Sequence, residues 1–114
     1  MAGLVFKLVD RPAWQAAAAA GVFGGSPVDA RDGFIHCSTA EQVRETAARH
    51  FAGQTDLLLV AIEASALGDA LRWEPSRGGA LFPHLYAPLP MDAVRWVAEL
   101  PLDEAGRHVF SDTV

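Results

Sequence analysis

The chain has 114 residues, 51% of them hydrophobic and 20% charged, which favours one folded globular domain over a disordered chain. The formal net charge of -5 argues against nucleic acid as the main partner, because binding to a phosphate backbone draws on clustered lysine and arginine. The single cysteine, Cys37, excludes an intramolecular disulfide.

The N-terminus lacks the charged segment and long apolar run of a signal peptide, and no apolar run reaches the roughly 20 residues of a membrane span. We therefore expect a cytoplasmic protein with no membrane partner. No repeat or linker divides the chain, which predicts a single domain over residues 1–110 with a C-terminal tail over residues 111–114. Nothing in the pattern specifies an oligomeric state.

The first elements follow from an apolar run and a helix-capping pattern. Residues 4–9 predict a strand, in which Lys7 points to an edge or to a site, with a solvated side chain as the favoured interpretation. Asp10 is expected to cap the following helix, in which Trp14 faces inward. Gly21 is expected to end that helix in a left-handed turn.

The stretch DGFIHCST, residues 32–39, is the segment around which the rest of the chain is organised. After a predicted loop over residues 24–32, Phe34 and Ile35 predict a short buried strand, and His36 stands between that strand and the next helix. A histidine in this position has two ring nitrogens beside the orphan N–H groups of a helix start. It suits either a polar ligand or a structural hydrogen bond that fixes the loop.

The helix after this segment is predicted from its start signals and its inward stripe. Two capping boxes are possible there, Ser38 with Glu41 or Thr39 with Gln42. The inward stripe is expected to hold four residues: Val43, Ala47, His50 and Phe51.

The second half of the chain predicts four strands, over residues 57–62, 71–74, 81–86 and 93–100. The first of them is apolar throughout, so it is expected to be the core strand, covered on both faces. The period of two along a strand places His84 and Tyr86 on the same side. The polar tail from Asp103 is expected to be frayed, with a mobile His108.

Strands and helices do not alternate regularly, which favours a mixed α+β domain over a doubly wound parallel sheet. We expect five or six strands in mostly antiparallel small sheets, with two main helices. Polar residues that could carry chemistry stand where strands meet turns, and they come from three segments: His36 with Ser38, Glu74, and His84 with Tyr86. They form one site if the fold brings them into one cleft.

Several segments of the chain resemble the DUF952 family, small bacterial and plant domains of unknown function. They are Lys7–Asp10 with Trp14, DGFIHCST at residues 32–39, LRWEP at 71–75, Gly79 with FPHLYAPLP at 82–90, and Val94–Val97. That family is similar in fold to the ADP-ribosyltransferase group, whose members bind NAD in a cleft between two small sheets. The resemblance therefore implies ADP-ribosyltransferase-like split sheets, with NAD or a related nucleotide as the ligand.

The resemblance also implies roles for the candidate residues. His36 would contact the ribose of the nicotinamide half, with Ser38 near it, and Tyr86 could stack against a ring. His84 joins these three as a candidate cofactor-binding residue, while Glu74, with His36, is the candidate catalytic residue. A carboxylate that accepts a ribose hydroxyl hydrogen bond would favour the positive charge that develops as nicotinamide leaves. No metal is expected in this site.

Two alternatives to a transferase remain open from the sequence. The same cleft could belong to a non-catalytic module that binds a small phosphorylated or carboxylated metabolite without turnover of NAD. A metal-dependent hydrolase could use His36, Glu74 and His84 as zinc ligands, although no short HxH or HExxH spacing supports it.

Cys37 has two interpretations. Near a histidine and a helix start its thiol could be an activated nucleophile. Adjacent residues of a strand point to opposite faces, however, so a thiol buried against the core is favoured.

Overall fold

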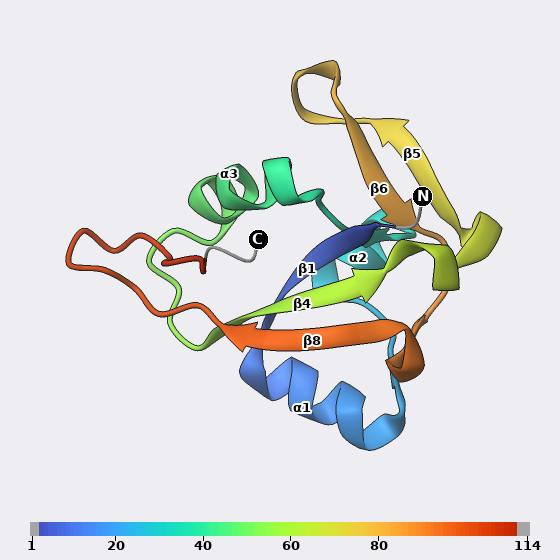
Figure 1. Ribbon diagram of the computed structural model, residues 1–114, viewed down its shortest axis with the longest axis horizontal. Helices are drawn as coiled ribbons and strands as arrows, with labels where there is room; N and C mark the ends of the chain where they lie inside the picture. The colour runs from blue at the N-terminus through green and yellow to red at the C-terminus, as the bar shows by residue number, and fades with distance from the viewer. Residues whose placement is uncertain (1–2, 112–114) are drawn as a thin grey trace.

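The computed structural model describes residues 3–111, which form three helices and eight strands (Figure 1). The helices are α1 (Arg11–Ala20), α2 (Pro27–Asp32) and α3 (Ala40–His50). The strands are β1 (Leu4–Asp10), β2 (Val22–Phe23), β3 (Ile35–His36), β4 (Leu57–Glu63), β5 (Leu71–Pro75), β6 (Leu81–Leu85), β7 (Leu89–Pro90) and β8 (Val94–Glu99). Short 3-10 turns lie at Ala64–Ala66, Gly68–Ala70, Arg77–Gly79 and Met91–Ala93.

The strands pair antiparallel in three small sheets, with the orders β1-β4-β8, β3-β6-β5 and β2-β7. The prediction of a mixed α+β fold with small antiparallel sheets is thereby confirmed. The predicted long strands are all present, with ends shifted by one residue. The two-residue strands β2 and β7 and the short helix α2 were not predicted.

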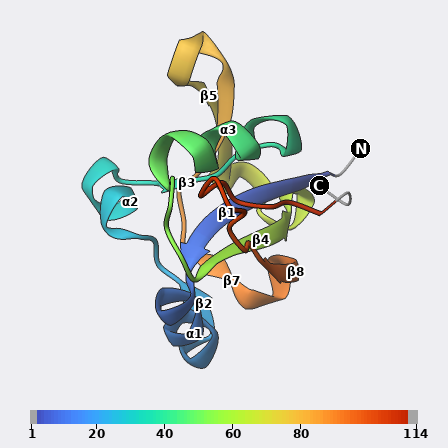
Figure 2. The ribbon, with the colours of Figure 1, turned by 90° about the vertical axis from the view of Figure 1, so that its left-hand side faces the viewer.

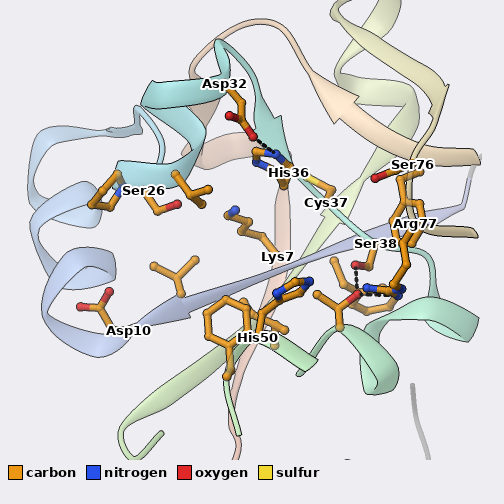
Figure 3. A pocket seen from close by; sticks show the side chains of 18 of the residues that line it. Lys7, Asp10, Ser26, Asp32, His36, Cys37, Ser38, His50, Ser76 and Arg77 are labelled. Atoms are coloured by element: carbon orange, nitrogen blue, oxygen red, sulfur yellow. Dashed lines mark hydrogen bonds and ion pairs between the residues drawn. The ribbon is translucent and has the colours of Figure 1, made fainter. Parts of the chain in front are cut away.

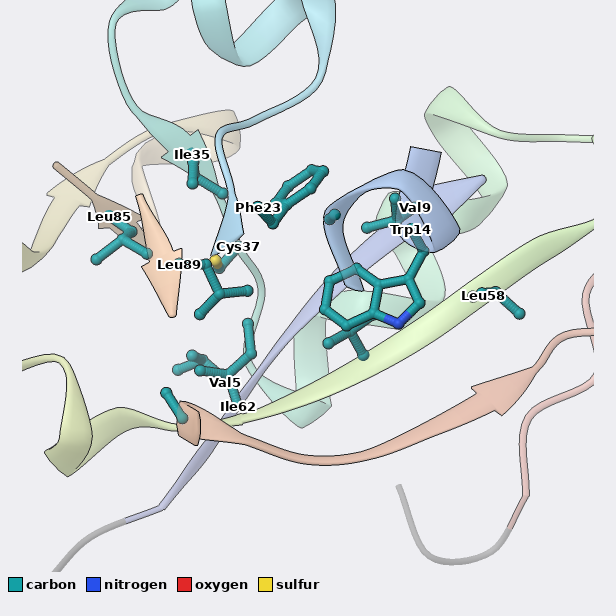
Figure 4. Close-up of a cluster of buried hydrophobic side chains, with 13 residues drawn as sticks. Val5, Val9, Trp14, Phe23, Ile35, Cys37, Leu58, Ile62, Leu85 and Leu89 are labelled. Atoms are coloured by element: carbon teal, nitrogen blue, oxygen red, sulfur yellow. The ribbon is translucent and has the colours of Figure 1, made fainter. Parts of the chain in front are cut away.

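The core strand β4 lies in the middle of its sheet, between β1 and β8. Alternate residues enter two separate apolar clusters, so the prediction that this strand is covered on both faces is confirmed. Leu58, Val60 and Ile62 belong to the first cluster, part of which is drawn in Figure 4. The other face carries Leu57, Leu59 and Ala61.

Helices α1 and α3 cover the two sides of this sheet, as Figure 2 shows. Trp14 of α1 packs in the first cluster, with its ring centroid 5.9 Å from that of Phe23, which confirms its predicted inward position. The predicted ends of α1 are confirmed as well. The Asp10 carboxylate accepts from the Ala13 N–H at 3.0 Å, and Gly21 has the left-handed φ of 86°.

Helix α3 begins with a capping box formed by Thr39 and Gln42, not by Ser38 and Glu41. The Gln42 N–H donates to the Thr39 hydroxyl oxygen at 3.2 Å, and the Thr39 N–H donates to the Gln42 side chain at 3.0 Å. Ser38 is therefore left outside the helix cap. Its backbone forms hydrogen bonds with Phe6 of β1.

Ser38 joins the two larger sheets. Its N–H donates to the Phe6 carbonyl and its carbonyl accepts from the Phe6 N–H, both at 2.8 Å. These two bonds form an isolated bridge between β1 and the segment that follows β3. Beyond the bridge the two chain segments diverge, and the space between them is the cavity described below.

Residues 24–32 were predicted as a loop, but residues 27–32 form helix α2. The Asp29 carboxylate accepts from the Ser26 N–H at 2.8 Å, which satisfies a donor that the start of the helix leaves free. The prediction was wrong because the proline, aspartates and glycines of this segment also fit a helix that begins after Ser26 and ends before Gly33.

The C-terminal segment is ordered, against the prediction of a frayed tail. The Val109 N–H donates to the Pro101 carbonyl at 2.8 Å, and the His108 ring contacts the Gln54 carbonyl at 2.8 Å through Nε2. Residues 112–114 lie outside the described residues, so the predicted boundary at residue 110 stays a prediction. Within residues 3–111, no helix is long and apolar enough to cross a membrane.

Candidate functional site

A cavity of about 640 Å³ opens where β1 and the segment after β3 diverge (Figure 3). Its floor is β1, and its walls come from α2, residues 36–38, α3 and the turn before β6. The polar residues of the lining are Lys7, Asp10, Ser26, Arg31, Asp32, His36, Ser38, Thr46, His50, Gln54, Ser76 and Arg77. Apolar side chains, mainly Phe6, Leu8, Val9, Phe51 and Phe82, form the rest of it.

His36 is held between two carboxylates at the wall of this cavity. Its Nδ1 lies 2.6 Å from Asp29 Oδ1 and its Nε2 lies 2.9 Å from Asp32 Oδ2. A neutral imidazole donates from one ring nitrogen only, so both contacts are hydrogen bonds from the histidine only when the ring carries both protons. The His36 side chain is 33% exposed, which leaves it accessible from the cavity.

Asp29 ties His36 to Lys7. The Lys7 ammonium lies 2.9 Å from Asp29 Oδ2, and both side chains are buried. Burial is the strongest single influence on the Asp29 carboxyl and acts to raise its pKa. The His36 hydrogen bond, the Lys7 charge and the N–H groups of Ser26 and His36 together outweigh burial and hold the pKa well below its usual range.

Lys7 is therefore not a solvated side chain, and that prediction was wrong. It projects from β1 into the cavity, toward His36 (Figure 3). The strand pattern shows only that Lys7 interrupts an apolar run. The partner that makes its burial possible lies 22 residues away, on a helix that was not predicted.

Ser38, the second predicted residue beside His36, lines the cavity but is almost fully buried. Its hydroxyl oxygen lies 3.1 Å from the Thr46 hydroxyl oxygen, and the Thr46 hydroxyl donates to the Gln42 carbonyl at 3.1 Å. Each hydroxyl has one proton, so the Ser38 hydroxyl donates to Thr46 in this arrangement. Ser38 then presents acceptor capacity to the cavity.

The other three predicted residues, Glu74, His84 and Tyr86, contact one another and do not line this cavity. Glu74 Oε1 lies 2.8 Å from His84 Nδ1 and accepts from the Tyr86 hydroxyl at 2.7 Å. The prediction that His84 and Tyr86 face the same side agrees with these contacts. The bonds from Tyr86 and then His84 lower the pKa of Glu74, and the same bond to Glu74 raises the pKa of Tyr86.

The Phe34 ring contacts His36 and also His84 and Tyr86, so it connects the wall of the cavity with the group around Glu74. His36 and His84 are register partners on β3 and β6, with ring centroids 5.8 Å apart. The Phe34 ring lies 4.5 Å from His36, 4.1 Å from His84 and 5.2 Å from Tyr86, measured between centroids. Of the residues predicted for one cleft, only His36 and Ser38 line the cavity, while Glu74, His84 and Tyr86 contact one another outside it.

Three residues of this arrangement were missed by the sequence interpretation: Asp29, Phe34 and Arg77. Arg77 stands beside two glycines in a turn, and backbone N–H groups in turns can form anion-binding concavities, which is the signal that could have found it. His50 was predicted on the inward stripe of α3, but it is exposed at the end of the helix and lines the cavity.

Cys37 is buried, and burial raises the pKa of its thiol to about 12. The prediction of a buried residue in the apolar core is confirmed, since Cys37 belongs to the first cluster (Figure 4). The structure does not favour the alternative of an activated nucleophile.

We expect iodoacetamide to alkylate Cys37 in the native protein at pH 8 on the order of a thousand-fold more slowly than in the urea-unfolded chain, because the thiolate is the reacting form. Mass spectrometry of timed samples measures both rates. Native alkylation at the unfolded rate would contradict the assignment of an inert thiol.

Among residues 3–111, no group of three or more His, Cys, Asp or Glu side chains is placed to hold a metal ion. His36, Glu74 and His84 accordingly do not form the zinc site that one alternative required. Glu74 and His84 contact each other, while His36 is held by Asp29 and Asp32.

Comparisons with known proteins agree on a family without a known function. The family model DUF952, described as a protein of unknown function, matches residues 8–97. The crystal structure of protein CC0527 from Caulobacter crescentus is similar, with 52% sequence identity, a TM-score of 0.91 and 94% of each chain covered. Its solution NMR structure has 54% identity, a TM-score of 0.83 and coverage of 91% of this chain and 90% of that chain. Comparison with curated proteins found no match.

Proposed function

We propose, from the premise that the chain belongs to the DUF952 family of proteins of unknown function, that the cavity beside His36 binds a small anionic metabolite. NAD or a related nucleotide is the first ligand to test. Neither nucleic acid nor a membrane is part of this proposal. The likeness in fold to the ADP-ribosyltransferase group stays a prediction.

One observation carries the proposal: basic and apolar side chains share a single cavity. Lys7, Arg31, His36, His50 and Arg77 line it, against the two acids Asp10 and Asp32. Apolar side chains of β1, together with Phe51 and Phe82, supply much of the rest of the wall. A volume of about 640 Å³ is in the range of small-molecule sites, which combine apolar walls with a few convergent polar groups.

ADP-ribosyl transfer is the second candidate function, supported by Glu74. Its carboxylate is held by Tyr86 and His84 on the sheet face that also carries His36. Hydrogen bonds from these two side chains favour the ionised form, which a carboxylate needs to stabilise positive charge on a departing ribose. Transfer requires that a ligand in the cavity extend past Phe34 to reach Glu74, so binding is the primary proposal.

Calorimetry and thermal unfolding with NAD, ADP-ribose, nicotinamide and simple nucleotides test the proposal. We expect NAD or ADP-ribose to raise the melting temperature, because a ligand that binds only the folded state stabilises it by mass action. His36→Ala should weaken that binding about tenfold or more, since it removes a polar group from the cavity wall. Nicotinamide released from NAD in the same samples reports turnover.

Two further variants separate the possible outcomes. His108→Ala, a histidine outside the cavity lining, should bind as the parent does. Glu74→Gln should bind NAD unchanged and abolish nicotinamide release if transfer occurs. Equal NAD binding by the parent and His36→Ala would mean that the site is misplaced, and no binding of any anionic ligand would overturn the proposal.

A further inference from the structure

We propose that Arg77 binds the anionic group of the ligand, and that the ligand is an amphipathic oxyanion whose apolar part lies along β1. This inference rests on the proposed function of the cavity. It names the chemical class, a carboxylate or phosphate on an aromatic or aliphatic body. It also names the side chain that selects it.

The charges of the cavity point to Arg77, because three of the other four basic groups in its lining already contact carboxylates. Lys7 lies 2.9 Å from Asp29, and Arg31 lies 2.9 Å from Asp32. His36 has carboxylate oxygens at 2.6 and 2.9 Å. These contacts leave little net positive charge for a ligand near β3.

Arg77 has no comparable partner among residues 3–111. Its closest carboxylate is Glu45, whose Oε2 lies 3.6 Å from the Arg77 Nε and also accepts from Arg49 at 2.8 Å. Its other polar contact is neutral, from Nη2 to the Thr46 hydroxyl oxygen at 3.5 Å. A guanidinium has five N–H donors, so most of the donors of Arg77 remain available to an oxyanion.

The guanidinium is also held in place before a ligand arrives. It lies over the ring of Phe82, with its central carbon 5.0 Å from the ring centroid, and the Arg77 side chain is only 23% exposed. The backbone behind it makes a tight turn that passes through Gly78 with a φ of 68°. A positioned planar fork binds a carboxylate or phosphate through two parallel hydrogen bonds.

Two further donors lie in the lining near this end of the cavity. Within residues 3–111 the Ser76 hydroxyl and the His50 ring make no hydrogen bond, and both residues line the cavity. The Ser38 hydroxyl already donates its hydrogen bond to Thr46, so it adds no donor. The oxyanion is therefore expected to bind Arg77 first, with Ser76 and His50 as supporting groups.

The apolar part of the lining determines the other half of the ligand. Phe6, Leu8 and Val9 of β1 and Phe51 after α3 give the lining an apolar surface. An inorganic anion cannot use that surface. A ligand that joins an oxyanion to an apolar body gains from both ends, because removal of apolar area from water adds to the ionic contact.

NMR titration with phenyl phosphate, benzoate and inorganic phosphate tests this inference. We expect phenyl phosphate or benzoate to bind the parent at least tenfold more tightly than inorganic phosphate does. Arg77→Gln should weaken that binding about 10- to 100-fold, the usual effect of losing a charged hydrogen bond. Comparison of the two organic probes shows whether phosphate or carboxylate is preferred.

Two variants keep the test specific. Arg44→Gln is the matched control, since Arg44 also lies over a phenyl ring, that of Phe110, but outside the cavity lining. It should bind as the parent does. Glu45→Gln removes the carboxylate nearest Arg77 and should tighten binding several-fold, a gain that misfolding cannot produce.

The outcomes separate the inference from the proposed function. If the parent binds the organic probes and Arg77→Gln binds them equally well, the role of Arg77 is wrong while the cavity keeps its function. Tighter binding of inorganic phosphate than of both organic probes would overturn the amphipathic class. If the parent binds no anion, including NAD and ADP-ribose, both proposals fail.

Discussion

Replacement of Asp29 by alanine is expected to lower the free energy of unfolding by about 3–5 kcal/mol, the usual cost of leaving a buried charge without its partner. The substitution strands the Lys7 ammonium inside the protein, where side-chain exposure is 6%. It also removes the acceptor of the Ser26 and His36 N–H groups. Urea unfolding followed by circular dichroism measures the change.

Two other substitutions give the expected order of effects. Lys7→Met should cost less, because Asp29 keeps the His36 ring and two backbone N–H groups as donors. Asp32→Ala should cost least, since that carboxylate is partly exposed and pairs with the exposed Arg31. A loss for Asp29→Ala no larger than for Asp32→Ala would show that the Lys7–Asp29 pair is not a structural requirement.

The stability of the protein is expected to fall steeply as the pH drops below about 4. The pKa of Asp29 is lower in the folded chain than its unfolded value of about 3.9. The stability that this group contributes is therefore present in full above the unfolded pKa and is lost as the pH falls through the folded pKa. Protonation removes the charge that balances Lys7.

Urea unfolding at pH 6, 4 and 3 of the parent and of Asp29→Asn measures this dependence. The variant has no carboxyl at position 29, so its stability should fall less between pH 6 and pH 3 than that of the parent. More exposed carboxylates with lowered pKa values, such as Glu45 and Glu74, contribute to the slope in both proteins. Identical slopes would rule out Asp29 as the main acid-sensitive group.

The elements that sequence predicts well are those fixed by neighbouring residues. The apolar run of β4, the Asp10 cap of α1 and the turn at Gly21 each need only a few adjacent positions to be interpreted. Helix α2 was not predicted, because its residues also suit a loop. Its start depends on Asp29, which has tertiary partners as well as a local one.

The site was predictable only in part, for a related reason. Strand periodicity gave the shared side of His84 and Tyr86, and residue type gave His36 as the group at the strand end. Whether Glu74 joins His36 depends on where the chain opens a cavity, which is set by the divergence of β1 from residues 36–38. No local pattern contains that information.

The order of strands in the two larger sheets has a consequence for how the protein is made. β4 pairs with both β1 and β8, and β6 pairs with both β3 and β5, so the strands of the two sheets interleave along the chain. A nascent chain that ends near residue 70 holds the cavity floor, β1, but lacks the part of the wall that Ser76, Arg77 and Phe82 form. The proposed ligand site is therefore complete only late in synthesis, and neither sheet can be excised as a contiguous, independently folding fragment.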